Sequence, residues 1–391
     1  MKINFPLLAL AVGAFAIGTT EFSPMGFLPE IARDLEISIP RAGMLISAYA
    51  LGVMLGAPLM TLWLSRYSKR KSLILLMAIF TIGNTLATLA PNYLGLMGAR
   101  IITSLNHGAF FGIGSVVAAS VVPKDKQASA VAMMFMGLTI ANIGGVPLAT
   151  WIGQHIGWRM AFLGISLLGL LTMFSLWKAL PEGQSSQKPD VRQELQVLTR
   201  LPVVLALLTT VMSAGAMFAL YTYIAPSLQS FTQVSPALIT LMLVLIGVGF
   251  SIGNHLGGKF ADLSLDKTLI GFLILLMLMM LLFPILASTA LGAGLALIIW
   301  GAAAFAVVPS LQMRVMSVAY DAPGLASSVN IGAFNLGNAL GAIAGASVLN
   351  LRLSYSAVSF TGARLSAVAL LLVVIQMKLA PQQDITAQQC S

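Results

Sequence analysis

Long apolar segments alternate with short polar or proline-containing breaks along almost the whole chain. Each apolar segment is close to the length of about 20 residues that a helix needs to cross a bilayer core. The segments lie near residues 6–28, 42–64, 73–90, 94–121, 128–152, 160–180, 202–225, 237–257, 268–287, 290–312, 324–349 and 359–379. The pattern therefore predicts twelve membrane-spanning helices in an all-α polytopic membrane protein.

Composition favours the same class and excludes a water-soluble globule. Of the 391 residues, 58% are hydrophobic and 8% are charged, whereas soluble domains average about 25% charged residues. The apolar segments leave no stretch long enough for a separate soluble catalytic domain. We therefore expect a protein that resides in a lipid bilayer and is not an enzyme.

The basic residues are distributed unevenly between the two sides of the membrane. An even number of spans places both termini on one side, where fifteen Lys and Arg residues fall, against four on the other. Because cytoplasmic loops carry such an excess, we expect both termini on the cytoplasmic face of a bacterial inner membrane. The net charge of +9 is then a signal of topology, and no nucleic acid partner is expected.

The first half of the chain is repeated in the second half at an offset of 197 residues. At this offset Ser65 falls on Asp262, and Arg70 falls on Lys267. The repeat predicts two six-helix halves in parallel orientation. The glycines and prolines that match are Gly18 with Gly215, Pro29 with Pro226, Gly52 with Gly249 and Gly56 with Gly253.

One long polar interruption, residues 181–201, divides the chain. We expect an N-terminal half over residues 1–180, a cytoplasmic linker over 181–201, a C-terminal half over 202–380 and a polar tail over 381–391. Parallel six-span repeats resemble the architecture of the major-facilitator transporters. That resemblance implies a solute cavity at the middle of the membrane, between the halves.

A loop after the second span, TLWLSRYSKRK, resembles the major-facilitator loop motif G-x-x-x-D-R-x-G-R-K. The motif residues that it keeps are Arg66, Lys69 and Arg70. It has Thr61, Ser65 and Ser68 where Gly, Asp and Gly are usual. The alternative is a basic cytoplasmic loop with no further role.

A second copy of this motif, GKFADLSLDK, follows the eighth span. It keeps Gly258, Asp262 and Lys267, and it has Leu263 where Arg is usual. The resemblance implies that these loops latch the cytoplasmic ends of the helices. The first copy departs from the motif at the acidic position of this latch.

One acidic residue, Glu21, lies inside the first apolar span. A carboxylate at membrane depth is costly and suggests a functional site with a partner. Arg100 in the fourth span, ARIITSLNHGAFFGIGSVVAAS, reaches a similar depth at a helical rise of about 1.5 Å per residue. This span resembles the family segment whose arginine is tied to proton coupling, which makes Glu21 and Arg100 candidates for that role. The alternative is a static ion pair that only fixes helix packing.

His107 lies about two turns deeper in the same span. An imidazole there is a candidate second titrating group or solute contact. The alternative is that His107 is neutral and only contributes to helix packing. Elsewhere the chain has no cluster of Cys, His or acidic residues at ligand spacing, so no metal or other cofactor is expected.

The fifth span, GLTIANIGGVPLATWIGQHIGWR, resembles the glycine–proline antiporter motif of efflux transporters. Small residues let helices approach closely, and proline bends a helix at the contact. Ordinary close packing is the alternative. The motif positions are Gly137, Gly144, Gly145, Pro147 and Gly153.

Further segments, TEFSPMGFLPEIA, NHGAFFG and FALYTYIAP among them, resemble the arabinose-efflux-permease-like branch of the drug:proton antiporters. Polar and aromatic residues within the spans are candidates to line a solute cavity, with helix packing as the alternative for each. These candidates are Tyr49, Phe110, Phe111, Asn142, Tyr221, Trp300, Phe305, Asn330, Asn335 and Asn338.

The sequence thus favours a monomeric, proton-coupled exporter of a small organic solute such as a sugar or a drug. Few charges fall in the expected cavity, which favours neutral or weakly charged solutes. A uniporter or a proton-coupled importer is the alternative within transport, because sequence does not set the direction. A sensor or scaffold derived from a transporter is the alternative of another class.

Overall fold

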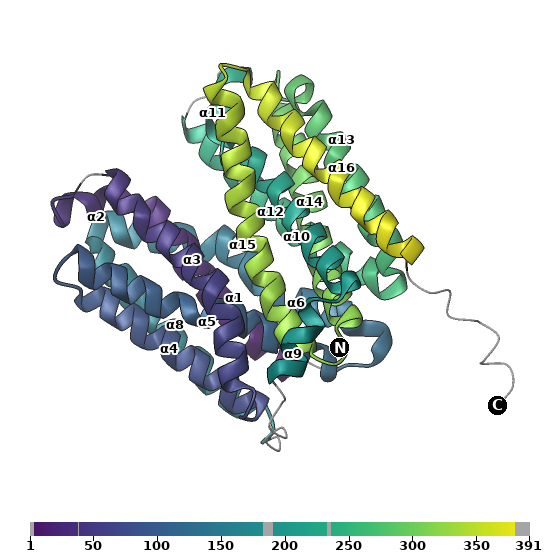
Figure 1. Ribbon diagram of the computed structural model, residues 1–391. Coiled ribbons are helices and arrows are strands. Elements are labelled where there is room, and N and C mark those ends of the chain that lie inside the picture. Colours follow the sequence, from purple (N-terminus) through teal and green to yellow (C-terminus); the bar gives the residue numbers. More distant parts are fainter. Residues whose placement is uncertain (1–3, 38, 183–190, 233–235, 380–391) are drawn as a thin grey trace, which may run out of the picture.

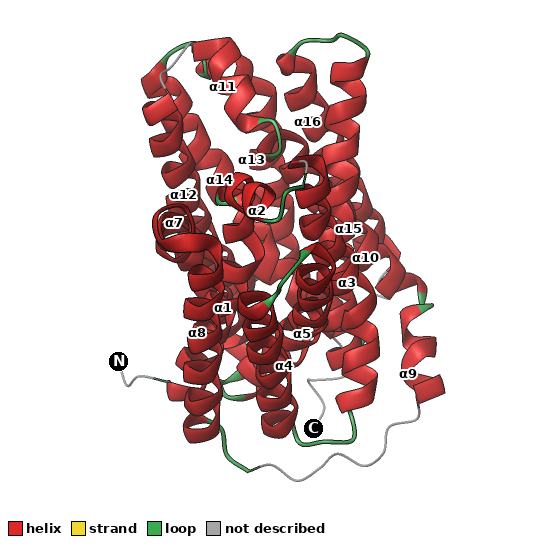
Figure 2. Ribbon diagram, turned by 90° about the vertical axis from the view of Figure 1, so that its left-hand side faces the viewer, coloured by secondary structure: helices red, strands yellow, loops and turns green. Residues whose placement is uncertain are grey.

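The computed structural model describes residues 4–37, 39–182, 191–232 and 236–379, and its regular elements there are all helices (Figure 2). The expected tail over 381–391 and part of the linker, 183–190, lie outside the described residues. The all-α fold class predicted from the apolar pattern is confirmed.

The first group of helices runs from the N-terminus to the linker. Its members are α1 (Phe5–Gly26), α2 (Leu28–Asp34), α3 (Ile39–Leu64), α4 (Lys69–Leu89), α5 (Tyr93–Ser120), η1 (Lys124–Lys126), α6 (Gln127–Ile140), η2 (Ala141–Gly145), α7 (Val146–Ile152), η3 (Gly153–Gly157) and α8 (Trp158–Ala179). The short helix α9 (Val191–Leu198) follows. The second group comprises α10 (Leu201–Tyr221), α11 (Ile224–Thr232), α12 (Pro236–Leu263), α13 (Leu265–Leu286), α14 (Ala290–Val318), α15 (Pro323–Asn350) and α16 (Tyr355–Leu379).

Eleven helical stretches of the described chain are long and apolar enough to cross a membrane. One of them, Lys124–Ala179, has 56 residues, which is about 84 Å of helix at 1.5 Å per residue. A bilayer core of about 30 Å cannot hold that length in one crossing. Gly157, with a φ of 129°, separates η3 from α8 and turns the chain back. This stretch therefore supplies two crossings, which brings the number to the predicted twelve.

The ends of two long helices differ most from the predicted bounds. Helices α12 and α14 continue to Leu263 and Val318, beyond the expected ends at 257 and 312. Their last turns contain polar residues, so a hydropathy pattern ends before the helix does. The short helices α2, α9 and α11 also lie outside the predicted spans, because each is too short to give an apolar segment.

The helices gather in two bundles, α1–α8 in purple to blue and α10–α16 in green to yellow (Figure 1). The packing within one bundle is repeated in the other: α3 packs on α5 as α12 packs on α14, and α4 packs on α8 as α13 packs on α16. Likewise α1 packs on α6 as α10 packs on α15. The two six-helix bundles predicted from the internal repeat are present in this arrangement.

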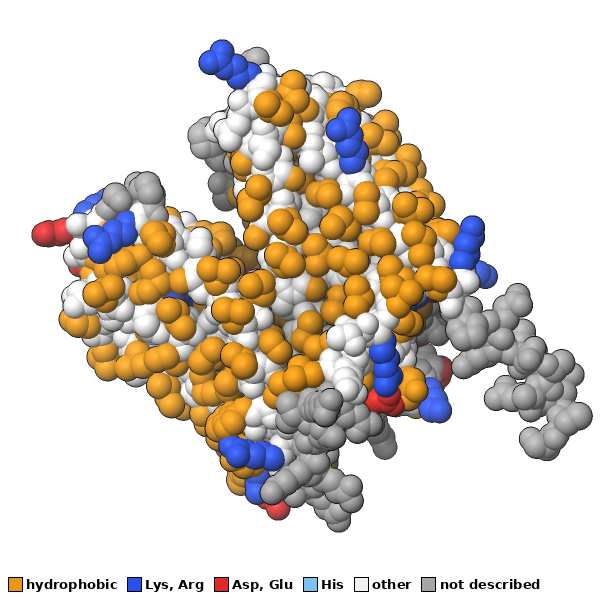
Figure 3. Space-filling view, in the orientation of Figure 1, with side chains coloured by type: hydrophobic (Ala, Val, Ile, Leu, Met, Phe, Trp, Pro, Cys, Tyr) orange, Lys and Arg blue, Asp and Glu red, His pale blue; other side chains and the backbone are white. Residues whose placement is uncertain are grey.

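The bundles touch along two seams, α6 with α12, and α3 and α5 with α15. We call the side of the bundles where α1 begins and α16 ends the terminal side, and the side of α2 and α11 the opposite side. The bundles diverge toward the opposite side (Figure 1), and the surface is hollowed between the two lobes (Figure 3). Hydrophobic side chains cover the visible flanks of both lobes, as expected for surfaces in contact with lipid (Figure 3).

Candidate functional site

A cavity of about 70 Å³ lies between the two bundles, and both bundles contribute to its wall. Its polar residues are Glu21, His107, Asn142, Asn335 and Asn338. Its aromatic rings are those of Phe22, Phe111, Phe135, Phe218, Tyr221, Phe250, Phe305 and Phe334. We call this the central cavity. A wall of eight aromatic rings and five polar side chains suits an aromatic molecule that also carries polar groups.

Six of the ten residues predicted to line a cavity lie on this wall: Phe111, Asn142, Tyr221, Phe305, Asn335 and Asn338. The other four, Tyr49, Phe110, Trp300 and Asn330, do not line it. Trp300 is fully buried and stacks on Tyr221, with ring centroids 6.3 Å apart, so it supports the wall from behind. Asn330 accepts a hydrogen bond from Thr210, 2.6 Å away, inside the second bundle.

Five lining rings were not predicted, those of Phe22, Phe135, Phe218, Phe250 and Phe334. Phenylalanine occurs in eleven of the twelve predicted spans, so residue type alone does not distinguish a ring that faces the cavity from one that faces lipid. The spacing of Phe218 and Tyr221, three residues apart on α10, was the one available signal, because such a pair shares a helix face. Their ring centroids are 5.6 Å apart.

Glu21 is the only carboxylate among the described residues that line the central cavity. It projects from α1, which packs closely against the glycine-rich fifth span. No ion pair joins Glu21 to a basic residue within 4.0 Å in the described part of the chain. The acid therefore faces the cavity without a direct cationic partner.

Arg100 is buried beside α1, at the depth expected from its position in the fourth span. Its Nη1 donates hydrogen bonds to the backbone oxygen of Thr20 (3.0 Å) and to the Thr20 hydroxyl (3.4 Å). Its guanidinium lies 4.2 Å from the centroid of the Tyr49 ring. Glu21 and Arg100 therefore form no direct ion pair in this conformation, and their part in proton coupling stays a prediction. Successive residues on a helix point about 100° apart, so Thr20 meets Arg100 while Glu21 turns to the cavity.

Tyr49 links Arg100 to His107. The tyrosine ring carries the guanidinium on its face, and its hydroxyl lies 3.2 Å from Nδ1 of His107. His107 lines the central cavity and also packs against Phe111, with ring centroids 5.2 Å apart. This position is compatible with both roles predicted for His107, helix packing and contact with a solute.

The glycines of the fifth span create the contact with α1. A Cβ atom at Gly137 would collide with the backbone oxygen of Ala11, and one at Gly145 with the side chains of Thr19 and Phe15. A Cβ atom at Gly144 would meet no other atom within 4 Å. The span is locally wound as π-helix in η2 and η3, with Pro147 at the start of α7 and Gly153 against Phe27. Such π segments often occur at functional sites, and η2 carries Asn142 into the cavity wall.

The second loop motif connects the bundles on the terminal side. The Asp262 carboxylate accepts hydrogen bonds from the backbone N–H groups of Ala128 (2.7 Å) and Ser129 (3.1 Å) at the start of α6. A carboxylate is favourable there because the first N–H groups of a helix have no partner within it. Gly258 allows the close approach, since a Cβ atom would meet Ala132. The backbone N–H of Lys267 bonds instead to the Ser264 hydroxyl at the start of α13.

The first loop motif makes contacts within its own bundle. Arg66 lies over the rings of Trp63 and Tyr67, at 5.4 and 5.1 Å. Arg70 donates to the backbone oxygen of Trp177 (2.7 Å) and lies 3.5 Å from the Glu182 carboxylate. Lys69 lines a second cavity on the terminal side. In the described part of the chain, no three acidic, His or Cys residues gather in a way that could hold a metal ion.

Comparison with known proteins assigns this architecture to a family. The profile of the Major Facilitator Superfamily matches residues 10–346. The chain belongs to the major facilitator superfamily. It is 65% identical over 382 residues to the inner membrane transport protein YdhP of Escherichia coli strain K12, which covers 98% of both chains. It is 31% identical over 348 residues to a chloramphenicol resistance protein of Streptomyces lividans, covering 88% of this chain and 89% of the other.

Solved structures agree with the fold. The major facilitator transporter FucP in the outward conformation superimposes with a TM-score of 0.78 at 16% identity, covering 96% of this chain and 99% of the other. At that identity the likeness shows the fold alone. The family and its relatives make this chain a membrane transporter and not an enzyme.

Proposed function

We propose that this major facilitator protein exports a small organic solute from the cytoplasm in exchange for protons, as a monomer. The observation that carries the proposal is the position of Glu21, a lone carboxylate on the wall of a cavity that both bundles form. A charged group at membrane depth is stabilised by a partner. A proton and a solute can each serve as that partner, and exchange of one for the other couples their movements.

The terminal side is the cytoplasmic side in this proposal. The excess of basic residues in its loops supports that orientation, and the name of the relative YdhP supports the inner membrane. The described conformation then has its bundles joined at the cytoplasm and divergent toward the periplasm. This is the state in which an exporter releases its solute and takes up a proton.

Arg100 and His107 are proposed to support the exchange from behind the cavity wall. Arg100 holds the backbone of Thr20, so a movement of its guanidinium would shift the next residue, Glu21, with respect to the cavity. Tyr49 couples that movement to His107 through the hydroxyl–imidazole contact of 3.2 Å. Because α1 packs on Gly137 and Gly145, the exchange is also linked to the position of the fifth span.

The chemistry of the cavity favours a drug-like solute over a sugar. A sugar needs a hydrogen-bonding group for most of its hydroxyls, whereas eight of the lining residues are aromatic. The similarity to a protein named for chloramphenicol resistance points to the same class. We therefore place the chain in the drug:proton antiporter branch, with an aromatic amphiphile as its solute.

Flux into liposomes tests this proposal. Purified protein would be reconstituted, and uptake of chloramphenicol and of the aromatic cation ethidium would be measured with and without an imposed pH gradient. We expect the gradient to accelerate uptake, and Glu21→Gln to remove at least nine-tenths of that acceleration. Glu182→Gln is the control, because its side chain is 88% exposed and does not line the central cavity.

Each alternative has its own outcome in the same assay. Flux that is independent of the pH gradient would indicate a uniporter and contradict the antiporter. Flux in the same direction as the protons would indicate a symporting importer. A folded protein that transports neither probe would favour other solutes or the sensor role.

A further inference from the structure

The two seams that join the bundles on the terminal side occupy equivalent places in the internal repeat, but they are built differently. At the offset of 197, Thr61 in α3 corresponds to Gly258 of α12, and Ser65, the residue directly after α3, corresponds to Asp262 of α12. In the α6–α12 seam, Asp262 caps α6 and Asn254 donates to the backbone oxygen of Ala132, 2.6 Å away. This seam is closed by charge-assisted and buried hydrogen bonds, which are the stronger kind.

Among the described residues, no charge-assisted hydrogen bond of this kind crosses the α3–α15 seam. Ser65 directly follows α3, and its hydroxyl donates to the backbone oxygen of Leu62 in that helix (2.6 Å). In the described part of the chain, two hydrogen bonds between neutral groups cross this seam: the hydroxyls of Thr61 and Ser328 lie 2.7 Å apart, and the Ser327 hydroxyl donates to the backbone oxygen of Gly112 on α5, 3.1 Å away. A neutral bond of this kind contributes only about 1 kcal/mol. The α3–α15 seam is therefore the weaker of the two.

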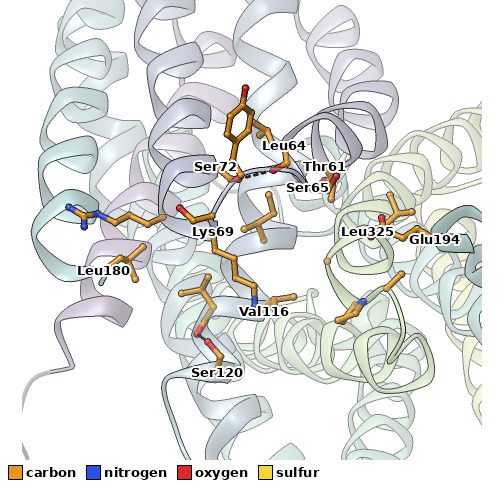
Figure 4. A pocket seen from close by; sticks show the side chains of 18 of the residues that line it. Thr61, Leu64, Ser65, Lys69, Ser72, Val116, Ser120, Leu180, Glu194 and Leu325 are labelled. Atoms are coloured by element: carbon orange, nitrogen blue, oxygen red, sulfur yellow. Dashed lines mark hydrogen bonds between the residues drawn. The ribbon is translucent and has the colours of Figure 1, made fainter. Parts of the chain in front are cut away.

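A cavity of about 460 Å³ opens where the missing latch would lie (Figure 4). Ser65, Lys69 and Val116 of the first bundle face it from one side, and Glu194 of α9 and Leu325 of α15 from the other. Ile113, Val116 and Val117 form an apolar wall, while Lys69 and Glu194 supply charge of both signs. Such a lining fits a molecule with an apolar body and a polar or charged group.

Only a thin layer separates this cavity from the central cavity. On α5, Ile113 lines the terminal-side cavity and Phe111 lines the central one; on α15, Leu325 and Ile331 do the same. Between them Gly112 lies directly against Ser328, and Ser327 donates to the backbone oxygen of Gly112, 3.1 Å away. Separation of α5 from α15 by the width of a side chain would join the two cavities.

We propose that the terminal-side cavity is a second solute site, where amphiphilic organic molecules load before they reach the central cavity. Loading proceeds through the α3–α15 seam, and the α6–α12 seam acts as the hinge. The direction of loading rests on the export function proposed above. The existence of the second site and the difference in strength between the seams do not depend on the export function. They can therefore be tested without any flux measurement.

Cysteine labelling compares the two seams. In a Cys390→Ser background, which removes the single native cysteine, one cysteine is introduced by Ser328→Cys or by Ala132→Cys. Both positions are buried, with 0% and 4% exposure. We expect N-ethylmaleimide to label position 328 at least ten times faster than position 132. Equal rates, or faster labelling at 132, would overturn the hinge assignment.

A second set of variants tests whether the missing carboxylate makes the α3–α15 seam weak. Ser65→Asp supplies the carboxylate that α12 has, and it should slow labelling at position 328 about tenfold by capping α15. Ser65→Ala is the matched control and should leave the rate unchanged. Asp262→Ala should raise the rate at position 132. A fast rate at position 328 that Ser65→Asp does not lower would show that the missing carboxylate is not the reason for the weak seam.

Protection from labelling tests the solute site. Val116→Cys places a cysteine on the cavity wall, and Leu263→Cys, at a position 79% exposed, is the control on the same side. We expect tetraphenylphosphonium or chloramphenicol to slow labelling at position 116 at least threefold and to leave position 263 unchanged. Absence of protection by both probes would overturn the site, whether or not the protein transports them.

Discussion

Arg100 donates a hydrogen bond to the backbone oxygen of Thr20, the residue directly before Glu21. The Arg100 guanidinium thus fixes the main chain of α1 at the residue before Glu21, and it restrains the Glu21 side chain indirectly. Thr20 is itself fixed, because its hydroxyl donates to Asn84, 2.7 Å away on α4. The position of Glu21 on the cavity wall therefore depends on side chains from three helices.

This relationship predicts that Arg100→Lys impairs transport although the charge is kept. A lysine ammonium lacks the planar fork that lies on Tyr49 while it bonds to Thr20. We expect at least a tenfold loss of pH-driven flux, which corresponds to about 1.4 kcal/mol. Arg66→Lys is the control, since Arg66 lies over the rings of Trp63 and Tyr67 on the terminal side and does not line the central cavity. Full flux in Arg100→Lys would show that charge alone suffices.

The glycines of the fifth span provide a stability prediction with an internal control. Gly137→Ala places a methyl group against the backbone oxygen of Ala11, and neither backbone can yield easily. We expect a loss of about 1–3 kcal/mol, as for other overpacked contacts. Gly144→Ala meets open space, so its effect should stay within about 0.5 kcal/mol. Thermal unfolding in detergent measures both, and equal melting temperatures would contradict the packing argument.

A cluster on the opposite side predicts a dependence on pH. Asp34 accepts hydrogen bonds from Arg159 and from the indole of Trp158 (3.1 Å). The hydrogen bond from Arg159 is the main reason why the pKa of Asp34 lies below its ordinary value of 3.8. A lowered folded-state pKa stabilises the protein at pH values above 3.8, and this contribution is lost as the pH falls through the lowered value.

Asp34→Asn should therefore destabilise the protein at neutral pH, by about 1 kcal/mol or less because the pair is partly exposed. The difference from the native protein should shrink as the pH falls below 3.8. Chemical unfolding at several pH values measures this. Asp125→Asn, at an exposed position in η1, is the control. A difference that grows at low pH would contradict the assigned sign.

The aromatic wall predicts a loss of solute affinity when a ring is removed. Phe218 lines the central cavity and packs edge-on against Tyr221. Phe218→Ala should weaken chloramphenicol binding by about 1 kcal/mol, or about fivefold. Phe174→Ala, on an outer surface where the ring is 53% exposed, should not change it. A thermal-shift titration gives both affinities, and an equal effect of the two changes would place the solute elsewhere.

The sequence alone determined the number, order and approximate bounds of the crossings. Transfer of a segment into lipid depends on its own length and apolar content, and both can be counted without knowledge of its neighbours. The same reasoning identified Glu21 as a residue that requires explanation, and Gly137 and Gly145 as points of close helix contact. These inferences depend on the free energy of placing a segment or a side chain in the membrane. Local composition determines that free energy.

Only the tertiary structure decided what each side chain meets. A difference of one residue turns a helical side chain by about 100°, so Arg100 contacts Thr20 and leaves Glu21 to the cavity. The same rotation places Trp300 behind Tyr221 and brings Phe250 to the cavity wall. Asp262 caps a helix that begins more than 130 residues earlier in the chain, while Ser65, its counterpart in the repeat, bonds to the helix that ends directly before it. Such contacts depend on how separate helices are rotated and packed against one another, and no local pattern contains that information.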